Sequence, residues 1–512
     1  MTFLLARRFV ADHVRNGYNL LLLLVVPVVF VVVAAPALVD SARLLGGAGG
    51  GSGIEIVTAG WVAAFLTAIS MYFQVSGNKE PDRRLVRAGL HRRHLIEARL
   101  LTGAVLALVA VLAALGALAL RTGIDDPGRV VAGTAMFAIV YLGIGAIVGA
   151  TVANTVNGTV IVMFVWILDI FFGPTLSGSS AVVLRLLPTH FVSLWTVDLP
   201  PGHGGPATLT WSLLWTAGSV LAAAGVVAAS AGAAQRRHRP RRHAVPAGVR
   251  GDQAAGQFAS GLRAGWRQWR RVPLFWVLLL VVPAVFVLLS DAITPHGRTV
   301  VVLREAGSRF VAQLDPADIH GGLMAPIAVG SLASLVGVFV VLDNRVADSR
   351  LALSGQRRWV LMTTRLTMVV VAALVASAVS LVVAAPVFEA GQWGVYATGL
   401  VLIGLTYGLV GVVIGPVFGR VSGVFLAFLV PFLDLGIGQS PMLRAEPSGW
   451  AQWLPGYGGI RVVIDGGLTP GFDESRALFI AVTWIVVLVA AAVLVLRLAP
   501  SDQSPGLPLR HG

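Results

Sequence analysis

Residues 78–100 read NKEPDRRLVRAGLHRRHLIEARL, and residues 344–366 read NRVADSRLALSGQRRWVLMTTRL. Each stretch is a charged island between two apolar segments that are long enough to cross a bilayer. Aligned without gaps at a separation of 266 positions, the first island (78–100) and the second island (344–366) share the pattern N-x3-D-x-R-L-x3-G-x2-R-x2-L-x3-R-L. The nine identities are Asn78/Asn344, Asp82/Asp348, Arg84/Arg350, Leu85/Leu351, Gly89/Gly355, Arg92/Arg358, Leu95/Leu361, Arg99/Arg365 and Leu100/Leu366. So many matches in one window indicate a tandem duplication.

The composition is that of a membrane protein. Of the 512 residues, 56% are hydrophobic and only 12% are charged, whereas soluble domains carry about 25% charged residues. The mean hydropathy is +0.82. Apolar runs of about 20 residues recur along the chain, which predicts transmembrane helices rather than a soluble core. The chain has no cysteine, which excludes disulfides and thiol chemistry.

The apolar runs predict an all-α, polytopic helical membrane protein with 12 transmembrane helices in a 6+6 tandem repeat. They cover residues 18–39, 54–76, 100–120, 130–153, 159–173, 207–234, 274–290, 323–342, 366–388, 396–418, 421–438 and 477–496. The first six-span half is expected at 1–243, a polar cytoplasmic linker at 244–257, and the second six-span half at 258–512.

An amphipathic segment precedes the spans of each half. In residues 2–15, Leu5 and Phe9 share one side, and in the second copy Phe258, Leu262, Trp266 and Trp269 share a face at helical spacing with arginine around it. Each of these segments is predicted to form an amphipathic helix that lies in the membrane interface. These two helices are called elbows below.

The first span could be mistaken for a signal peptide. Its core, LLVVPVVFV at 23–31, recurs as LLVVPAVFV at 279–287, in mid-chain where no signal peptide can lie. It is therefore expected to be retained. The offset between copies is 256 here and about 266 afterwards, which predicts a ten-residue insertion within 291–322.

Basic residues gather on one side of the predicted spans. They lie in the N-terminal segment, both islands and the cluster 236–243, whereas the opposite loops are poorer in arginine. The positive-inside rule then predicts a multi-pass protein of the plasma membrane with both termini cytoplasmic. The net charge of +14 is best explained by this arginine and by its attraction to anionic membrane lipid, so no nucleic-acid partner is expected.

Two interpretations of the islands are open. Either they are solvated basic anchors that set topology, or each holds a short helix that docks on another protein. Topology requires arginine but not Asp, Leu and Gly at fixed offsets, so the repeat favours docking. The candidate residues are Asp82, Arg84, Leu85, Gly89 and Arg92, with Asp348, Arg350, Leu351, Gly355 and Arg358 as their counterparts. Gly is typical of a helix end. Arg99 and Arg365 are expected to be snorkelling anchors at the start of the third span of each half.

A second repeated pair is Asp169 and Asp434, which lie deep in apolar runs. Such a carboxylate costs about 2.5–3.5 kcal/mol at the centre of a membrane helix. It could be a polar site on a substrate path, or it could cap the half-helix that follows, where Pro- and Gly-containing sequence breaks the span. The broken stretch favours the cap.

No catalytic motif is present. The chain has a single lysine, Lys79 in SGNKEP, so it contains no G-x4-G-K-[ST] phosphate-binding loop. We found no metal-ligand pattern and no nucleophile motif, so the chain is not expected to be an enzyme.

The layout resembles the membrane subunit of ATP-binding cassette (ABC) exporters of the type-2 permease family, with two permease halves fused in one chain. The shared features are six spans per half, an elbow before each half, a basic helix between spans two and three, and a broken external stretch between spans five and six. The resemblance implies that both islands contact a separate cytoplasmic ABC ATPase, in two copies, which would bind the ATP and magnesium. It implies export of a drug, antibiotic or lipid-like substrate, and no cofactor in this chain.

Two alternative functions remain. A major-facilitator-type secondary transporter also has two six-span halves with a basic loop between spans two and three. Its loop motif is more compact than the spacing from Asp82 to Arg92, and elbows fit it poorly. The other alternative is a membrane scaffold that does not transport.

Overall fold

The structure is a computed structural model of the chain. It describes residues 1–498 except 16, 45–46, 48–49, 153, 177–181, 200–204, 234–253, 271–272, 306 and 448. Within these ranges, nine helices are long and apolar enough to cross a membrane. The chain is a helical, multi-span membrane protein.

The first half contains helices α1 to α10. Their bounds are α1 Thr2–Arg15, α2 Gly17–Val29, the π-helix η1 Phe30–Ala34, α3 Ala35–Leu44, α4 Gly50–Gly77, α5 Lys79–Arg87, α6 Arg92–Arg121, α7 Pro127–Thr151, α8 Thr155–Phe171, the 3₁₀ turn η2 Val182–Leu186, α9 His190–Val197 and α10 Leu209–Ala233.

The second half repeats this order. Its elements are α11 Ala254–Arg270, α12 Pro273–Ile293, β1 Thr299–Glu305, β2 Ser308–Leu314, α13 Pro316–Leu342, α14 Arg345–Leu353, α15 Arg358–Ala384, α16 Trp393–Pro431, the π-helix η4 Phe432–Gly438, the 3₁₀ turn η5 Gly449–Trp453, α17 Tyr457–Leu468 and α18 Ser475–Leu498. Because α11 begins at Ala254, residues 254–257 of the expected linker are helical. Residues 244–253 and the basic cluster 236–243 lie outside the described residues.

The expected spans 396–418 and 421–438 form one continuous apolar segment, 393–438. A break lies between them all the same, because Gly419 has φ +74° and ψ −166°, which is not helical. The expected spans 159–173 and 274–290 correspond to the shorter apolar helices Val156–Phe171 and Trp276–Ala292.

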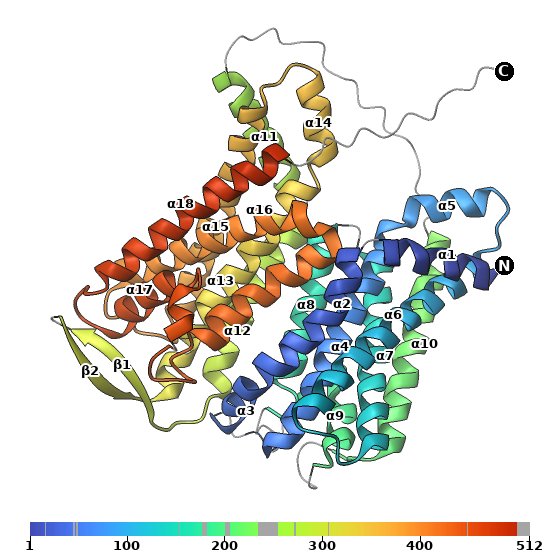
Figure 1. The fold of residues 1–512 in the computed structure, drawn as a ribbon, viewed down its shortest axis with the longest axis horizontal. Helices are drawn as coiled ribbons and strands as arrows, with labels where there is room; N and C mark the ends of the chain where they lie inside the picture. Colours follow the sequence, from blue (N-terminus) through green and yellow to red (C-terminus); the bar gives the residue numbers. More distant parts are fainter. Residues whose placement is uncertain are drawn as a thin grey trace.

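The fold is helical, as expected, apart from one short hairpin that the sequence did not predict. The segment that carries the expected insertion, 291–322, contains a two-stranded antiparallel hairpin, β1–β2, with Thr299 paired to Leu314 and Glu305 to Ser308. Val302 N donates to Ala445 O at 3.1 Å, which fixes the hairpin to the loop after η4. The hairpin projects from the edge of the second half (Figure 1).

Each half is built around its second span. Helices α4 and α13 are almost entirely buried and pack along α7 and α16, respectively. A side chain at Gly145 would collide with the backbone of Ala68, and one at the matching Gly411 would collide with the backbone of Ser334. These glycines let the helix backbones approach closely in both copies.

The halves lie side by side (Figure 1). Matching elements of the two halves pack against each other: α2 contacts α16 and η1 contacts η4, while α12 contacts α8. Helices α1, α5, α11 and α14 lie toward one end, called the basic end below, and α9, α17 and the hairpin lie toward the opposite end.

Candidate functional site

Both islands fold into a short helix, a glycine turn and the start of a long helix. The side-chain amide of Asn78 donates to Gln74 O at 2.9 Å and closes the end of α4, as Asn344 does with Val340 O at 2.9 Å at the end of α13. Gly89 and Gly355 have φ of +97° and +95°, the left-handed conformation that glycine tolerates.

The same capping bonds end both short helices. Leu90 N donates to Leu85 O at 3.1 Å, and Gln356 N donates to Leu351 O at 3.0 Å. In both copies the N–H bonds to the carbonyl five residues earlier, and a glycine directly precedes the donor residue. This is the hydrogen-bond pattern of a Schellman motif at a helix C-terminus. The turn reverses the chain, so that α6 packs back along α4 and α15 back along α13.

An ion pair fixes each short helix to the following span. Arg99 Nη2 donates to Asp82 Oδ1 at 2.8 Å. Arg365 Nη2 donates to Asp348 Oδ1 at 2.5 Å, and its Nε donates to Oδ2 at 3.1 Å. The side chains of Arg99 and Arg365 are only 10% and 13% exposed.

These pairs add to the sequence interpretation. The guanidinium groups of Arg99 and Arg365, expected to be anchors, are bound to carboxylates. Asp82 and Asp348, predicted to contact a partner, make an internal contact, and their side chains are 21% and 23% exposed. The repeated Asp and the second repeated Arg therefore hold the islands in shape.

The remaining repeat residues form the accessible surface of the islands. Arg84 and Arg350 are exposed, and Leu85 and Leu351 are 38% and 40% exposed although both are leucines. Arg92 and Arg358 are exposed as well, but they are the first residues of the long helices α6 and α15 rather than members of the short helices. Leu95 and Leu361 are buried inward.

The two surfaces are not alike. On the second island Leu353 is 89% and Trp359 is 53% exposed. The first island has Arg87 and Arg93 at these places, and both are exposed. The first surface is therefore more cationic and the second more apolar.

The elbows dock beside the islands. In α1, Thr2 Oγ1 donates to Glu97 Oε2 at 3.0 Å, and the ring of Phe9 lies 3.8 Å beneath the Arg99 guanidinium. In α11, Arg357 N donates to Gln257 Oε1 at 3.4 Å. Each elbow therefore contacts the same part of the chain as its island: the start of α6 for α1, and the start of α15 for α11.

A further ion pair lies next to the second island. Arg420 Nη2 donates to Asp343 Oδ1 at 2.5 Å and joins the end of α13 to the break in α16. Burial raises the pKa of the Asp343 carboxyl, and the Arg420 guanidinium opposes that rise.

Asp169 and Asp434 are buried at the start of the broken stretches. Asp169 Oδ1 accepts a hydrogen bond from Thr189 N at 3.1 Å, and Asp434 Oδ2 accepts one from Gly456 N at 2.8 Å. Thr189 and Gly456 are the residues immediately before α9 and α17. Both carboxylates therefore bind the backbone N–H of the residue that directly precedes a short helix, and so they lie at the N-terminus of that helix.

A buried tyrosine completes each carboxylate site. Tyr141 donates to Asp169 Oδ2 at 3.0 Å, and Tyr407 donates to Asp434 Oδ2 at 2.5 Å. The tyrosines are 266 positions apart, like the islands. Sequence reasoning missed them because a tyrosine in an apolar span is typical of core packing; matching the two copies residue by residue would have found them.

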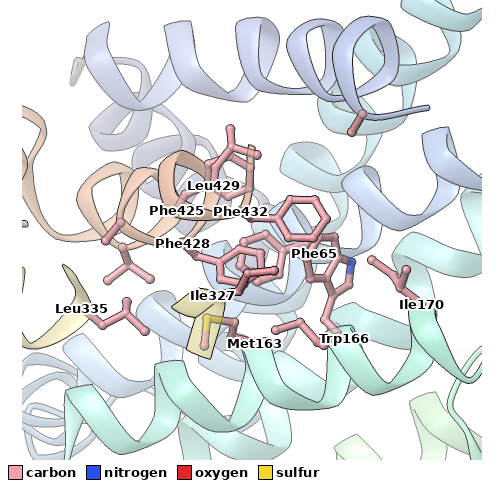
Figure 2. Packing of buried hydrophobic residues seen from close by; sticks show 14 of the residues in the cluster. Phe65, Met163, Trp166, Ile170, Ile327, Leu335, Phe425, Phe428, Leu429 and Phe432 are labelled. Carbon is pink, nitrogen blue, oxygen red and sulfur yellow. The ribbon is translucent and has the colours of Figure 1, made fainter. Parts of the chain in front are cut away.

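The interface between the halves is filled with aromatic rings (Figure 2). The ring centroid of Phe65 in α4 lies 5.1 Å from that of Phe425 in α16. Trp166 of α8 meets Phe428 edge to face at 5.6 Å, and Phe30 of η1 stacks on Phe432 of η4 at 6.3 Å. The sequence pattern did not single out these residues.

The aromatic cluster closes the space between the halves. Phe30, Phe65, Trp166 and Phe428 are each at most 2% exposed. Within the ranges described, no group of three or more His, Cys, Asp or Glu could hold a metal ion. Neither a protein-family model nor a curated protein matches the chain.

Proposed function

We propose that the chain is the permease subunit of an exporter driven by a separate ATPase. In this proposal it has twelve spans in two six-span halves, lies in the plasma membrane, and has its basic end and both termini in the cytoplasm. The cargo is lipophilic: a drug, an antibiotic or a lipid-like molecule.

One observation carries the proposal: the two islands present a matching exposed leucine and arginines toward the same end of the molecule, although their outer residues differ. Their internal Asp–Arg pairs and glycine turns hold the short helices in fixed shape, while Leu85 and Leu351 remain accessible. A rigid helix with an exposed leucine and arginine suits docking on a protein. A basic loop that only sets the membrane topology would need arginine, but it would not need the Asp–Arg pair, the glycine turn or the exposed leucine.

The partner supplies the chemistry that this chain lacks. With Lys79 as its only lysine the chain has no phosphate-binding loop, so ATP and magnesium would be bound by the partner. Two islands call for two copies of a cytoplasmic ATPase. Approach of the two copies would move the islands and, through the Asp–Arg pairs, the third span of each half.

The aromatic interface supports a lipophilic cargo. The rings of Phe65 and Phe425 would separate as the halves rock, and the surface then uncovered is apolar. Asp169 and Asp434 would position α9 and α17, which would close the path at the outer end.

The test begins with the tagged chain purified from native membranes. We expect an ATPase to co-purify, with ATP hydrolysis stimulated by lipophilic cargo. Arg92→Glu should abolish this stimulation while membrane insertion stays intact. Arg43→Glu, the same charge change on α3 at the other end, is the control and should behave like wild type.

Two outcomes would favour the alternatives. Transport that survives ATP depletion but collapses with the proton gradient would indicate a secondary transporter. A chain that recovers no ATPase, and whose deletion leaves drug resistance unchanged, would indicate a scaffold.

A further inference from the structure

Large apolar side chains are exposed on the second island where the first island has arginine. Leu353, Trp359 and Leu351 are 89%, 53% and 40% exposed, respectively, and are called the apolar patch below. Leu353 is the last residue of α14 and Trp359 is the second residue of α15, so these two lie on either side of the glycine turn. The first island has the exposed Arg87 and Arg93 at the positions of Leu353 and Trp359.

The two islands do not differ in net charge. The first contains seven basic and three acidic residues, and the second contains five basic residues and one acidic residue, so each has a formal charge of +4. Part of the first island's charge is offset locally, because Arg93 Nε donates to Glu97 Oε1 at 2.7 Å. An acidic partner is therefore attracted to both islands, and the property that distinguishes them is apolar surface.

Lipid is a poor cover for the apolar patch. Residues 366–385 form a run of 20 without a charged residue, which is enough for a helix to cross a hydrocarbon core of about 30 Å. Trp359 precedes this run by seven residues of α15, or about 10 Å along the helix axis, whereas the head-group layer is only about 5–8 Å thick. Helices α14 and α11 also project beyond the rest of the second half (Figure 1). The patch therefore faces water, and an exposed apolar patch that lipid does not cover is typical of a protein-binding site.

We propose that the second island is the tight docking site for one copy of the ATPase and that the first island is a weaker, salt-sensitive site for the other copy. This inference rests on the proposed function. The occupant of the second island is an ATPase surface with an apolar pocket for Leu353 and Trp359 and an acidic rim. The rim is inferred from Arg357 and Arg358, which are exposed and lie between these two residues in the turn.

The difference between the sites follows from the physics of the two contacts. Attraction between exposed charges is largely screened at high salt, whereas burial of apolar surface is not weakened by salt. Tryptophan and arginine are the side chains that most often dominate the energy of a protein interface. Burial of one such tryptophan makes binding tighter by about 30-fold or more, so the second island should keep its ATPase when the first has lost it.

The test measures how many ATPase copies the chain holds as salt rises. The complex of the full-length chain with its co-purifying ATPase is weighed by native mass spectrometry after equilibration at each salt concentration. ATP is left out, so that the chain and not the other copy holds each ATPase. We expect two copies per chain at about 0.1 M salt and one copy at about 1 M salt.

Two double variants identify the site that keeps its copy. Leu353→Ser/Trp359→Ser leaves the charge of the second island unchanged and should hold no copy at high salt. Arg87→Leu/Arg93→Trp installs the apolar residues on the first island and should hold two. Leu120→Ser is the control: Leu120 is 92% exposed but lies at the opposite end of α6, so this variant should behave like wild type.

Three results would overturn the inference while the proposed function stands. The first is loss of both copies over the same range of salt. The second is a copy that stays on Leu353→Ser/Trp359→Ser at high salt. The third is unchanged ATPase binding by that variant with a lower unfolding free energy of the chain alone, which would mean that the chain's own segments cover the patch. Recovery of no ATPase at any salt concentration would instead overturn the proposed function and this inference together.

Discussion

At the scale of single residues, the residues that are repeated in the two islands fall into two groups: those that make internal contacts and those that lie on the accessible surface. Asn78, Asp82, Gly89 and Arg99 serve the internal fold, as a cap, an ion pair and a turn. Their matches in the second island do the same. Leu85 is 38% exposed and lies on the accessible surface of the first island beside exposed arginines, so this surface is the one that a partner could reach.

The ion pair between Asp82 and Arg99 should be measurable as a coupling. Asp82→Asn leaves a guanidinium that is largely buried without its carboxylate, so we expect a loss of about 1–3 kcal/mol in unfolding free energy. The double variant Asp82→Asn/Arg99→Gln should lose less than the sum of the single variants. Unfolding in mixed micelles provides the measurement.

The exposed pair Arg15–Asp12, with side chains 82% and 60% exposed at 3.5 Å, is the control for this cycle. Asp12→Asn should change the unfolding free energy by less than about 1 kcal/mol. Strict additivity of the Asp82 and Arg99 variants would show that the pair does not hold α5.

The carboxylate of Asp434 offers a second test at this scale. Asp434→Ala removes the acceptor for Gly456 N, Tyr407 and Gln439, and we expect a loss of about 2–3 kcal/mol because these donors stay buried. Asp434→Asn keeps an acceptor oxygen, so it should lose about half as much and still export. Thermal unfolding and vesicle export measure the two effects.

Asp169→Asn in the first half should repeat this result. If either Asn variant unfolds like wild type but exports nothing, the carboxylate acts on the cargo path and the capping role is secondary.

At the scale of elements, the islands depend on their glycine turns. Gly89 has φ +97°, which an alanine adopts only at a cost of about 1–2 kcal/mol, yet a Cβ there would meet nothing within 4 Å. Gly89→Ala should therefore fray α5 without disturbing the core. We expect cargo-stimulated ATPase activity of the reconstituted complex to fall several-fold while expression is unchanged.

Gly77→Ala is the matched control. This glycine also has open space for a Cβ, but it lies at the end of α4 and has no positive φ. Equal activity in the two alanine variants would mean that the shape of α5 does not matter for coupling.

The sequence predicted most elements because their signals are local. Helical apolar runs, the repeat and the Gly419 break could all be read from spacing. The hairpin could have been read as well, since TVVVLRE is rich in β-branched residues and a glycine precedes SRFVAQL. It was missed because it lies in a loop predicted only as an insertion.

At the scale of the whole molecule, the duplication predicts two similar halves but not how they pack. In membrane spans, residues that face lipid and residues that face another helix are equally apolar, so periodicity cannot separate them. Phe65 and Phe428 are therefore ordinary in the sequence and central in the structure. The contacts of α2 with α16 and of α12 with α8, which join the two halves, follow from no sequence pattern and are seen only in the structure.

Rocking of the halves can be tested at that interface, because the chain has no cysteine of its own. In Phe65→Cys/Phe425→Cys, a short bis-methanethiosulfonate cross-linker would form a disulfide with each cysteine and join α4 to α16. The ring centroids of Phe65 and Phe425 lie 5.1 Å apart. If the halves separate during transport, the cross-link should stop export and cargo-stimulated ATP hydrolysis, and reduction should restore both. Phe388→Cys/Tyr396→Cys, at 5.3 Å within the second half, is the control and should leave export intact after cross-linking. Full export by completely cross-linked Phe65→Cys/Phe425→Cys protein would mean that the halves do not part there, and the cargo would have to follow another path.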